Sequence, residues 1–231
     1  MNQYDLLASL YEKLMGDLGD LPNKYLLNPI LLKHLPQDKN LYVLDAGCGS
    51  GRWTKVLAGR YDKVIGVDNS KELLKIAKND RSAENISYSF SDLENPLPFE
   101  DNIFDLIFSN MVVHYLSNMT KIANEFYRIL KSNGTLLFST HHPKFDLARY
   151  KFLKKVNKRT KFVNKDSLKG KAAVTRYYEP IDLFIKHFID AGFILISQED
   201  RIITPEFEKI YPRYRDYVGL PRFTVFKFQK K

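Results

Sequence analysis

The stretch Leu41-Tyr-Val-Leu-Asp-Ala-Gly-Cys-Gly-Ser-Gly51 decides the fold. Its first four residues form a short apolar run that predicts a buried strand, and the glycines after it predict a tight loop. Arg52–Gly59 is expected to be a helix, and Lys63–Val67 a second strand. A strand, a glycine loop, a helix and another strand in this order predict a parallel βαβ unit with a right-handed crossover.

The rest of the chain continues this alternation. Further strands are expected at Ile86–Phe90, Phe104–Ser109, Thr135–Thr140, Phe193–Ser197 and Phe223–Phe228. Further helices are expected at Tyr4–Met15, Pro22–Leu35 (kinked or split at Pro29), Ser70–Lys78, Asn118–Leu130 (ended by Asn133-Gly134) and Pro180–Ala191. The last two strands have no predicted helix between them, so the last one should enter antiparallel. The sequence therefore predicts an α/β fold with a Rossmann-like, doubly wound sheet.

Composition restricts the class of protein. The chain has 231 residues, 44% of them hydrophobic, and a single cysteine, Cys48. This length fits one domain spanning residues 1–231, and one cysteine excludes an internal disulfide or a multi-cysteine zinc module. No apolar run is long enough to span a bilayer, and no signal peptide is visible at the start. We expect a cytoplasmic protein, and the sequence leaves its oligomeric state open.

Basic residues are concentrated in residues 141–178. This segment has 12 Lys and Arg and two acidic residues, a net charge of +10, whereas the whole chain is +9, so the remainder is −1. Phe152, Val156 and Val163 are spaced as one face of a helix, with lysines around them. Three interpretations stay open: a solvated lysine face, a site for an anionic acceptor, or a nucleic-acid contact.

The glycine loop constrains the ligand. Its spacing from Gly47 is G-x-G-x-G, and Arg52 stands where a dinucleotide-binding loop has its third glycine, which argues against a bound pyrophosphate. Asp45, two residues before Gly47, would repel phosphates but suits a cationic ligand. Asp68 ends the second strand 21 residues after Gly47, where a carboxylate can accept two ribose hydroxyls.

Five motifs in order carry a resemblance. They are Val43-Leu-Asp-Ala-Gly-Cys-Gly-Ser-Gly51, Ile65-Gly-Val-Asp-Asn-Ser70, Ser91-Asp-Leu93, Phe108-Ser-Asn-Met-Val-Val-His-Tyr115 and Phe126-Tyr-Arg-Ile-Leu-Lys-Ser-Asn-Gly-Thr-Leu-Leu137. With them the chain resembles the class I S-adenosylmethionine-dependent methyltransferases, within the group of small "type 11" enzymes. The resemblance implies a seven-stranded sheet, bound S-adenosylmethionine and methyl transfer. It also implies an N-terminal helical cap over residues 1–36 and an inserted lid over residues 141–178.

The resemblance assigns the cofactor side residue by residue. The glycines would pack against the methionine part of the ligand, Asp68 would hold the ribose, and Asp92 with the Leu93 amide would bind the adenine. The full expected set is Asp45, Gly47, Cys48, Gly49, Asp68, Asn69, Asp92, Leu93 and Asn110. Within this set, Cys48 is expected to be a small packed residue rather than a nucleophile.

The acceptor side is less defined. His114 follows the fourth strand and is a candidate general base, because its ordinary pKa lies near neutral; the alternative is a structural histidine. Tyr115, His141 and His142 are candidate substrate contacts. We expect no metal, since no carboxylate or thiol stands at ligand spacing from these histidines.

Two features that the sequence lacks restrict the class of methyl acceptor. The only cysteine lies in the cofactor loop, which argues against methylation of pyrimidine carbon 5, and Ser109-Asn-Met-Val112 lacks the prolines typical of exocyclic-nitrogen methyltransferases. We therefore expect methyl transfer to an O, N or C atom of a small molecule, including an anionic one. A tRNA wobble-base methyltransferase is the second hypothesis, and a non-catalytic S-adenosylmethionine-binding regulatory protein is the third.

Overall fold

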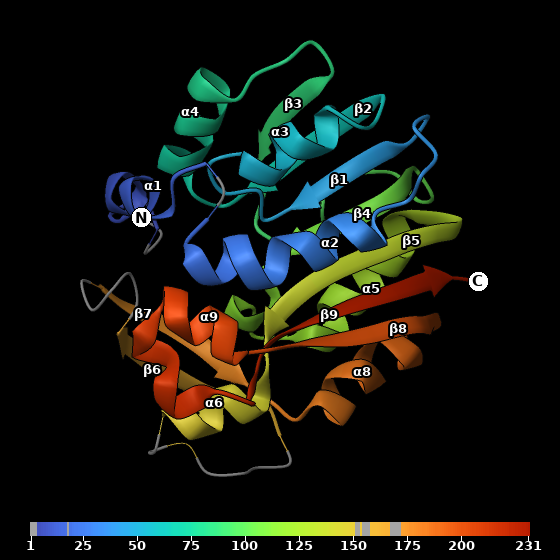
Figure 1. Cartoon of the computed structure of the whole chain (residues 1–231). Helices are drawn as coiled ribbons and strands as arrows, with labels where there is room; N and C mark the ends of the chain where they lie inside the picture. The colour runs from blue at the N-terminus through green and yellow to red at the C-terminus, as the bar shows by residue number, and fades with distance from the viewer. Residues whose placement is uncertain (1–3, 18, 151–152, 154–157, 167–171) are drawn as a thin grey trace.

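The computed structural model describes residues 4–17, 19–150, 153, 158–166 and 172–231. At its centre is a seven-stranded sheet of order β3-β2-β1-β4-β5-β9-β8 (Figure 1). Its strands are β1 (Tyr42–Ala46), β2 (Lys63–Asp68), β3 (Ile86–Phe90), β4 (Phe104–Asn110), β5 (Leu130–His141), β8 (Phe193–Ile202) and β9 (Pro221–Lys230). Strands β1 to β5 pair in parallel, and β9 runs antiparallel to β5 and β8. The predicted doubly wound α/β sheet with an antiparallel last strand is confirmed.

Helices cover both faces of this sheet. Neighbouring residues of the central strands point to opposite faces, so Val43 and Leu44 of β1 belong to two separate hydrophobic cores. One core lies under η1 (a π-helix, Asn23–Leu27), α2 (Asn28–His34) and α3 (Arg52–Ala58). The other lies under α5 (Met119–Ile129) and α8 (Ile181–Asp190). Because the central strands are buried on both faces, they read as continuous apolar runs rather than alternating ones.

Side-chain caps fix where two of these helices begin. The Ser70 hydroxyl accepts a hydrogen bond from the Leu73 amide at 3.3 Å, at the start of α4 (Lys71–Asp80). The Asn118 side chain accepts one from the Lys121 amide at 3.1 Å, at the start of α5. Such caps satisfy backbone N–H groups that have no partner inside the helix. The predicted cap at Ser70 therefore holds.

Two predictions about the second half of the chain are wrong. Helix α5 ends at Ile129 and β5 begins at once, with Asn133 and Gly134 inside an irregular part of that strand rather than at the helix end. A bulge accommodates Asn133, whose φ is +63°. The last two strands are separated by α9 (Pro205–Ile210) and a 3-10 helix, η3 (Pro212–Tyr217), where no helix was expected.

The described residues of segment 141–178 lie below the carboxyl edge of the sheet (Figure 1). They contain α6 (Pro143–Arg149) and an antiparallel pair, β6 (Thr160–Asp166) with β7 (Ala172–Tyr178). Burial alternates along β6, with Phe162 and Asn164 inside and Val163 outside. The expected helical face is therefore wrong for Val163, because the local period is two rather than 3.6. The rest of that predicted face, Phe152 and Val156 with Lys151, Lys154 and Lys155, lies outside the described residues.

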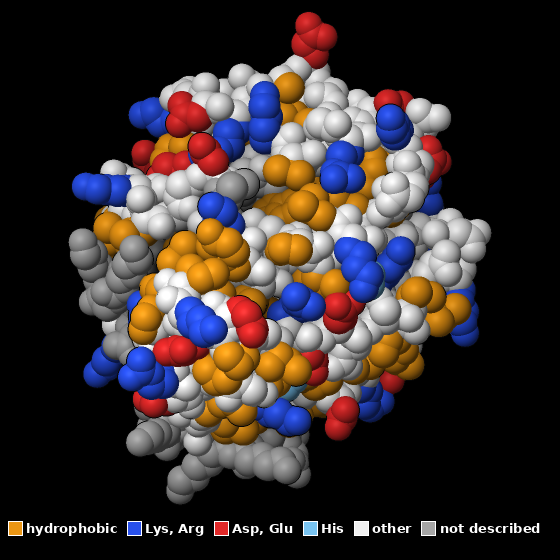
Figure 2. All heavy atoms as spheres, viewed as in Figure 1, with side chains coloured by type: hydrophobic (Ala, Val, Ile, Leu, Met, Phe, Trp, Pro, Cys, Tyr) orange, Lys and Arg blue, Asp and Glu red, His pale blue; other side chains and the backbone are white. Residues whose placement is uncertain are grey.

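Basic side chains form no single cluster on the face of the protein shown in Figure 2. There, Lys and Arg side chains are spread among acidic ones and apolar patches. The described lysines of the basic segment, Lys144, Lys158, Lys161 and Lys165, are all exposed. No helix in the described part of the chain is long and apolar enough to cross a bilayer.

Candidate active site

A cavity of about 480 Å³ lies at the carboxyl edge of the parallel strands. Strands β2 and β3 lie on one side of β1, and β4 and β5 lie on its other side, so the order of the strands reverses between β1 and β4. Ligands of open α/β sheets bind at such a switch point. The predicted site residues that line it are Asp45, Gly47, Cys48, Gly49, Asp68, Asn69, Asp92, Leu93, Asn110, Tyr115 and His141. Of the predicted set, only His114 and His142 are not on its wall. Residues of motifs that are far apart in the sequence therefore line the same cavity.

The glycine loop after β1 follows a backbone path that favours glycine. Gly47 has φ +82° and Gly49 φ +55°, both left-handed. The amides of Gly47 and Cys48 both donate to the carbonyl of Val67, at 2.8 and 2.9 Å. A Cβ on Gly47 would lie 2.4 Å from a methyl carbon of Val112. The loop is therefore packed between the ends of β2 and β4, and its backbone can approach a ligand closely.

Asp68 holds the loop and faces the cavity. One of its carboxylate oxygens accepts the Gly49 amide at 2.8 Å and the other accepts the Ser70 amide at 2.8 Å. Burial raises the pKa of Asp68, and these two hydrogen bonds oppose the rise. Each oxygen keeps further lone pairs, so the carboxylate can still accept from ligand hydroxyls. Asp92 accepts the Glu94 amide at 3.1 Å and lies on the same wall.

Asp45 is buried behind the loop. Its carboxylate accepts a hydrogen bond from the Thr54 hydroxyl at 2.6 Å. Burial raises the pKa of Asp45 to about 7, and the nearby Asp68 carboxylate adds to that rise. Burial likewise raises the pKa of the Cys48 thiol well above its usual value, so it stays neutral. Cys48 therefore serves as a small wall residue rather than a nucleophile.

The end of β4 carries a strained residue that the sequence did not reveal. Met111 has φ +60° and lines the cavity directly after Asn110. Its amide donates to the Ser139 carbonyl at 3.2 Å, and the Ser139 hydroxyl donates to Asn110 at 2.6 Å. Non-glycine residues in this conformation are uncommon and concentrate at functional sites. A methionine in a loop gives no sequence signal for it.

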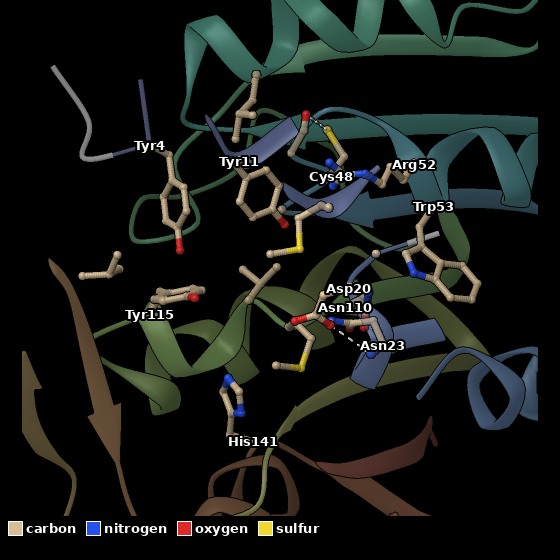
Figure 3. Close-up of a pocket in the computed structure, with 18 of the residues that line it drawn as sticks. Tyr4, Tyr11, Asp20, Asn23, Cys48, Arg52, Trp53, Asn110, Tyr115 and His141 are labelled. Atoms are coloured by element: carbon tan, nitrogen blue, oxygen red, sulfur yellow. Dashed lines mark hydrogen bonds between the residues drawn. The ribbon is translucent and has the colours of Figure 1, made fainter. Parts of the chain in front are cut away.

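The N-terminal segment closes over the glycine loop. Helix α1 (Ala8–Met15) is shorter than the predicted Tyr4–Met15, with a turn before it. Glu12 of α1 pairs with Arg81 and, at 2.7 Å, with Arg52, which also lies over the Tyr11 ring at 5.0 Å. Tyr4 packs edge-on against Tyr115 at 5.5 Å between ring centres. These contacts hold the N-terminal segment against the cavity wall. Figure 3 shows Tyr4, Tyr11 and Tyr115 at this wall.

The two histidines nearest the cavity differ in access. His141 points into it from the side opposite Cys48 (Figure 3). His114, of the 3-10 helix η2 (Val113–Tyr115), lies behind it in a small adjoining space, with the two rings 4.7 Å apart. The His114 Nδ1 is 3.2 Å from the Thr140 hydroxyl. The geometry thus brings His141, rather than His114, against a ligand in the main cavity.

His142 has a structural role in the described contacts. Its Nδ1 accepts the Lys144 amide at 3.1 Å at the start of α6, and its Nε2 lies 3.3 Å from Asp200. Burial lowers its pKa, and Asp200 opposes that shift. Within the described residues, no group of three or more His, Cys, Asp or Glu is arranged to hold a metal ion.

Part of the cavity wall comes from the second half of the chain. This part includes Arg149, Tyr150, Asn164, Val174, Arg176, Tyr211, Arg213, Tyr214, Arg222 and Phe223. Segment 141–178 supplies the first five of these. The sequence drew attention to its lysines, but arginines are the basic residues on this wall. In the sequence, no local pattern distinguishes an arginine that lines a cavity from one that is exposed on the surface.

Comparison with known proteins gives the same domain. Residues 44–138 match the family model described as "Methyltransferase domain". The chain is 37% identical over 110 residues to malonyl-[acyl-carrier protein] O-methyltransferase of Hamiltonella defensa, covering 48% of this chain and 42% of that one. It is 31% identical over 137 residues to ubiquinone biosynthesis O-methyltransferase of Coxiella burnetii, covering 57% and 58%. The chain thus spans about half the length of the curated relatives it matches.

Similarity to solved structures extends over almost the whole chain. An S-adenosylmethionine-dependent methyltransferase from Mesorhizobium loti superposes with a TM-score of 0.74 at 20% identity, covering 93% of this chain and 100% of that one. At this identity the likeness concerns the fold. The motifs, the family match and the fold agree with one another. Residues 44–138 thus match a methyltransferase domain, and the chain shares the fold of S-adenosylmethionine-dependent methyltransferases of known structure.

Proposed function

We propose that the protein binds S-adenosylmethionine and transfers its methyl group to a small-molecule acceptor. The observation that carries this proposal is that one cavity brings together three carboxylates from the ends of neighbouring parallel strands. Asp45, Asp68 and Asp92 line it together with Gly47 and Gly49 of the glycine loop. Carboxylates at the ends of neighbouring parallel strands suit a ligand with hydroxyls and positive charge.

The residues present fit this ligand. Asp68 has lone pairs for the ribose hydroxyls, and Asp92 can accept from the adenine amino group. Gly47 and Gly49 leave room for close backbone approach, and Cys48 and Leu73 give the same wall a less polar surface. The names of the curated relatives, an acyl-carrier-protein and a ubiquinone-pathway O-methyltransferase, support oxygen as the accepting atom.

The chain's own contribution to the reaction would be positioning. A sulfonium donor supplies an activated methyl group with a good leaving group. The cavity walls hold the acceptor in line with that group, and α1 with segment 141–178 keeps water out. The proposal assigns no general base to His114, because its ring lies behind that of His141 and burial lowers its pKa well below the usual value.

The test is calorimetric titration with S-adenosylmethionine and S-adenosylhomocysteine, followed by detection of S-adenosylhomocysteine formed with a panel of small acceptors. We expect micromolar binding of both ligands and turnover with at least one acceptor. No binding heat with either ligand would refute the proposal. Binding with turnover on tRNA alone would favour the nucleic-acid hypothesis, and binding with no turnover on small molecules or tRNA would favour a regulatory protein.

The pH dependence of binding tests the role of Asp45. Its pKa in the free protein is about 7 because it is buried. A cation bound nearby stabilises the carboxylate and lowers this pKa, so binding should release a proton and affinity should rise from about pH 6 to about pH 8. Calorimetry in buffers of different ionisation heat measures the proton. Asp45→Asn should remove both the proton release and the pH dependence.

The same group has a predictable effect on stability. The folded-state pKa of Asp45 lies above the usual 3.8, so the folded protein binds this proton more tightly than the unfolded chain. The contribution of Asp45 to the free energy of unfolding should therefore fall as pH rises from about 4 to about 7. Asp45→Asn should flatten that part of the stability profile. An unchanged profile would contradict the assignment.

A further inference from the structure

Arg176 is a buried cation with unused hydrogen-bonding capacity. It lies on β7, is 2% exposed and lines the main cavity. One terminal nitrogen donates to Asp146 at 3.2 Å, yet the Arg176 Nε and the other Asp146 oxygen have no partner among the described residues. Burying a guanidinium is costly unless its donors are satisfied. The pair is thus held by one hydrogen bond where a two-bond fork is available, which leaves one edge of Arg176 for a ligand.

Arg222 approaches the same space from β9. Its guanidinium lies over the Phe145 ring at 4.3 Å and the Phe223 ring at 4.5 Å. It donates to the Tyr214 hydroxyl at 3.3 Å and to the Nδ1 of His141. All of these partners are neutral, and Arg222 makes no ion pair with an acidic residue in the described part of the chain. The aromatic faces orient its charge without neutralising it.

The histidines in front of these arginines complete a donor surface. Burial, and then the charges of Arg176 and Arg222, lower the pKa of His141 and of His114 well below the usual value. Both rings are therefore neutral. Because the Nδ1 of His141 accepts from Arg222, its remaining proton sits on Nε2, which can donate to a ligand. Two guanidinium groups and one N–H thus belong to the wall of one cavity, and Asp146, the carboxylate paired with Arg176, is not on that wall.

We propose that Arg176 and Arg222 bind a carboxylate of the methyl acceptor, with the His141 Nε2–H as a third donor. The acceptor class assigned in this way is a carboxylic acid. The inference rests on the proposed function for its meaning in catalysis, but the anion site itself does not depend on bound S-adenosylmethionine. A carboxylate, planar and singly charged, matches the free edge of a guanidinium.

The test uses acetate as the probe, because it has the charged group without a side chain whose shape must fit. The nitrogen-15 resonance of the Arg176 Nε–H is followed by NMR while acetate is added to the protein, once without a second ligand and once with S-adenosylhomocysteine present. We expect a saturable shift with millimolar affinity and no saturation with neutral acetamide. Inorganic phosphate is the second anion, and it should bind more weakly. No saturable shift with acetate, or tighter binding of phosphate, would overturn the proposal.

Variants change the site in opposite directions. Arg222→Gln is expected to weaken acetate binding about tenfold, because a charge-assisted donor is lost. Asp146→Asn should tighten it, since Arg176 loses its internal counter-ion. Arg215 is an exposed arginine paired with Glu208. The variant Arg215→Gln is therefore the matched control, and it should leave acetate affinity unchanged. An unchanged affinity in both Arg222→Gln and Asp146→Asn would refute the assignment, and the opposite signs exclude a general folding defect as the cause.

Failure of this inference can be told from failure of the proposed function. Binding of S-adenosylhomocysteine is measured by calorimetry on the same samples. If S-adenosylhomocysteine binds and acetate does not, only the carboxylate site is wrong. If acetate binds and S-adenosylhomocysteine does not, the methyltransferase proposal fails and the anion site stands.

Discussion

Replacing Asp68 with Asn is expected to weaken S-adenosylmethionine binding about 100-fold. In the structure both carboxylate oxygens accept backbone amides, from Gly49 and from Ser70. An asparagine has one oxygen, so its NH₂ group would face one of those N–H donors. The substitution therefore disturbs the loop and removes a charged acceptor for the ribose. A hydrogen bond to a charged group is worth about 1.5–3 kcal/mol, and losing one near the upper end of this range gives this order of effect.

The measurement is calorimetric titration with S-adenosylmethionine and S-adenosylhomocysteine, with thermal unfolding to check that the variant folds. Asp190→Asn is the matched control. Asp190 is an exposed carboxylate paired with Lys186 on α8, far from the loop in sequence. Its loss should leave affinity unchanged. Equal affinity in Asp68→Asn and the unaltered protein would show that the carboxylate does not contact the ligand.

Gly47→Ala should have the second large effect, on folding and on binding together. The residue has φ +82°, and a Cβ there would lie 2.4 and 2.7 Å from the two methyl carbons of Val112. The left-handed conformation costs an alanine about 1–2 kcal/mol. Overpacking adds about 1–3 kcal/mol, so the free energy of unfolding should fall by about 3 kcal/mol. Ligand binding should be lost, because the loop must shift to relieve the clash.

Gly49→Ala separates the two causes. Its φ is +55°, but the nearest atom to a Cβ is a Leu73 methyl at 3.9 Å. Strain alone should cost about 1 kcal/mol in denaturant unfolding. In the double variant Gly47→Ala, Val112→Ala the clash is removed, so part of the lost stability should return. If Gly47→Ala and Gly49→Ala are equally stable, the contact with Val112 is not what requires the glycine.

The convergence of the glycine-loop side of the cavity could be predicted because each of the predicted residues there follows a strand. Asp45, Asp68, Asp92 and Asn110 stand just after predicted strands or in the turns that follow them, and all of them line one cavity. Parallel strands in one sheet end at the same edge, so strand order and local spacing are enough to bring such residues together. The parallel strands and the cap at Ser70 followed from local pattern in the same way. The last strand is antiparallel as expected, but the reason given for it, the absence of a helix before it, is wrong, because α9 and η3 lie there.

The proposed acceptor side of the cavity was decided by tertiary structure. Arg176 and Arg222 come from β7 and β9, and nothing in their neighbourhood marks them among 36 basic residues. Likewise, His114 and His141 each follow a strand, and only packing shows that His141 lies in front. The local sequence determines where each strand ends, and parallel strands end at the same edge of the sheet. Which side chains from an added segment and an antiparallel strand meet across a cavity depends on long-range packing, which leaves no periodic trace in the chain.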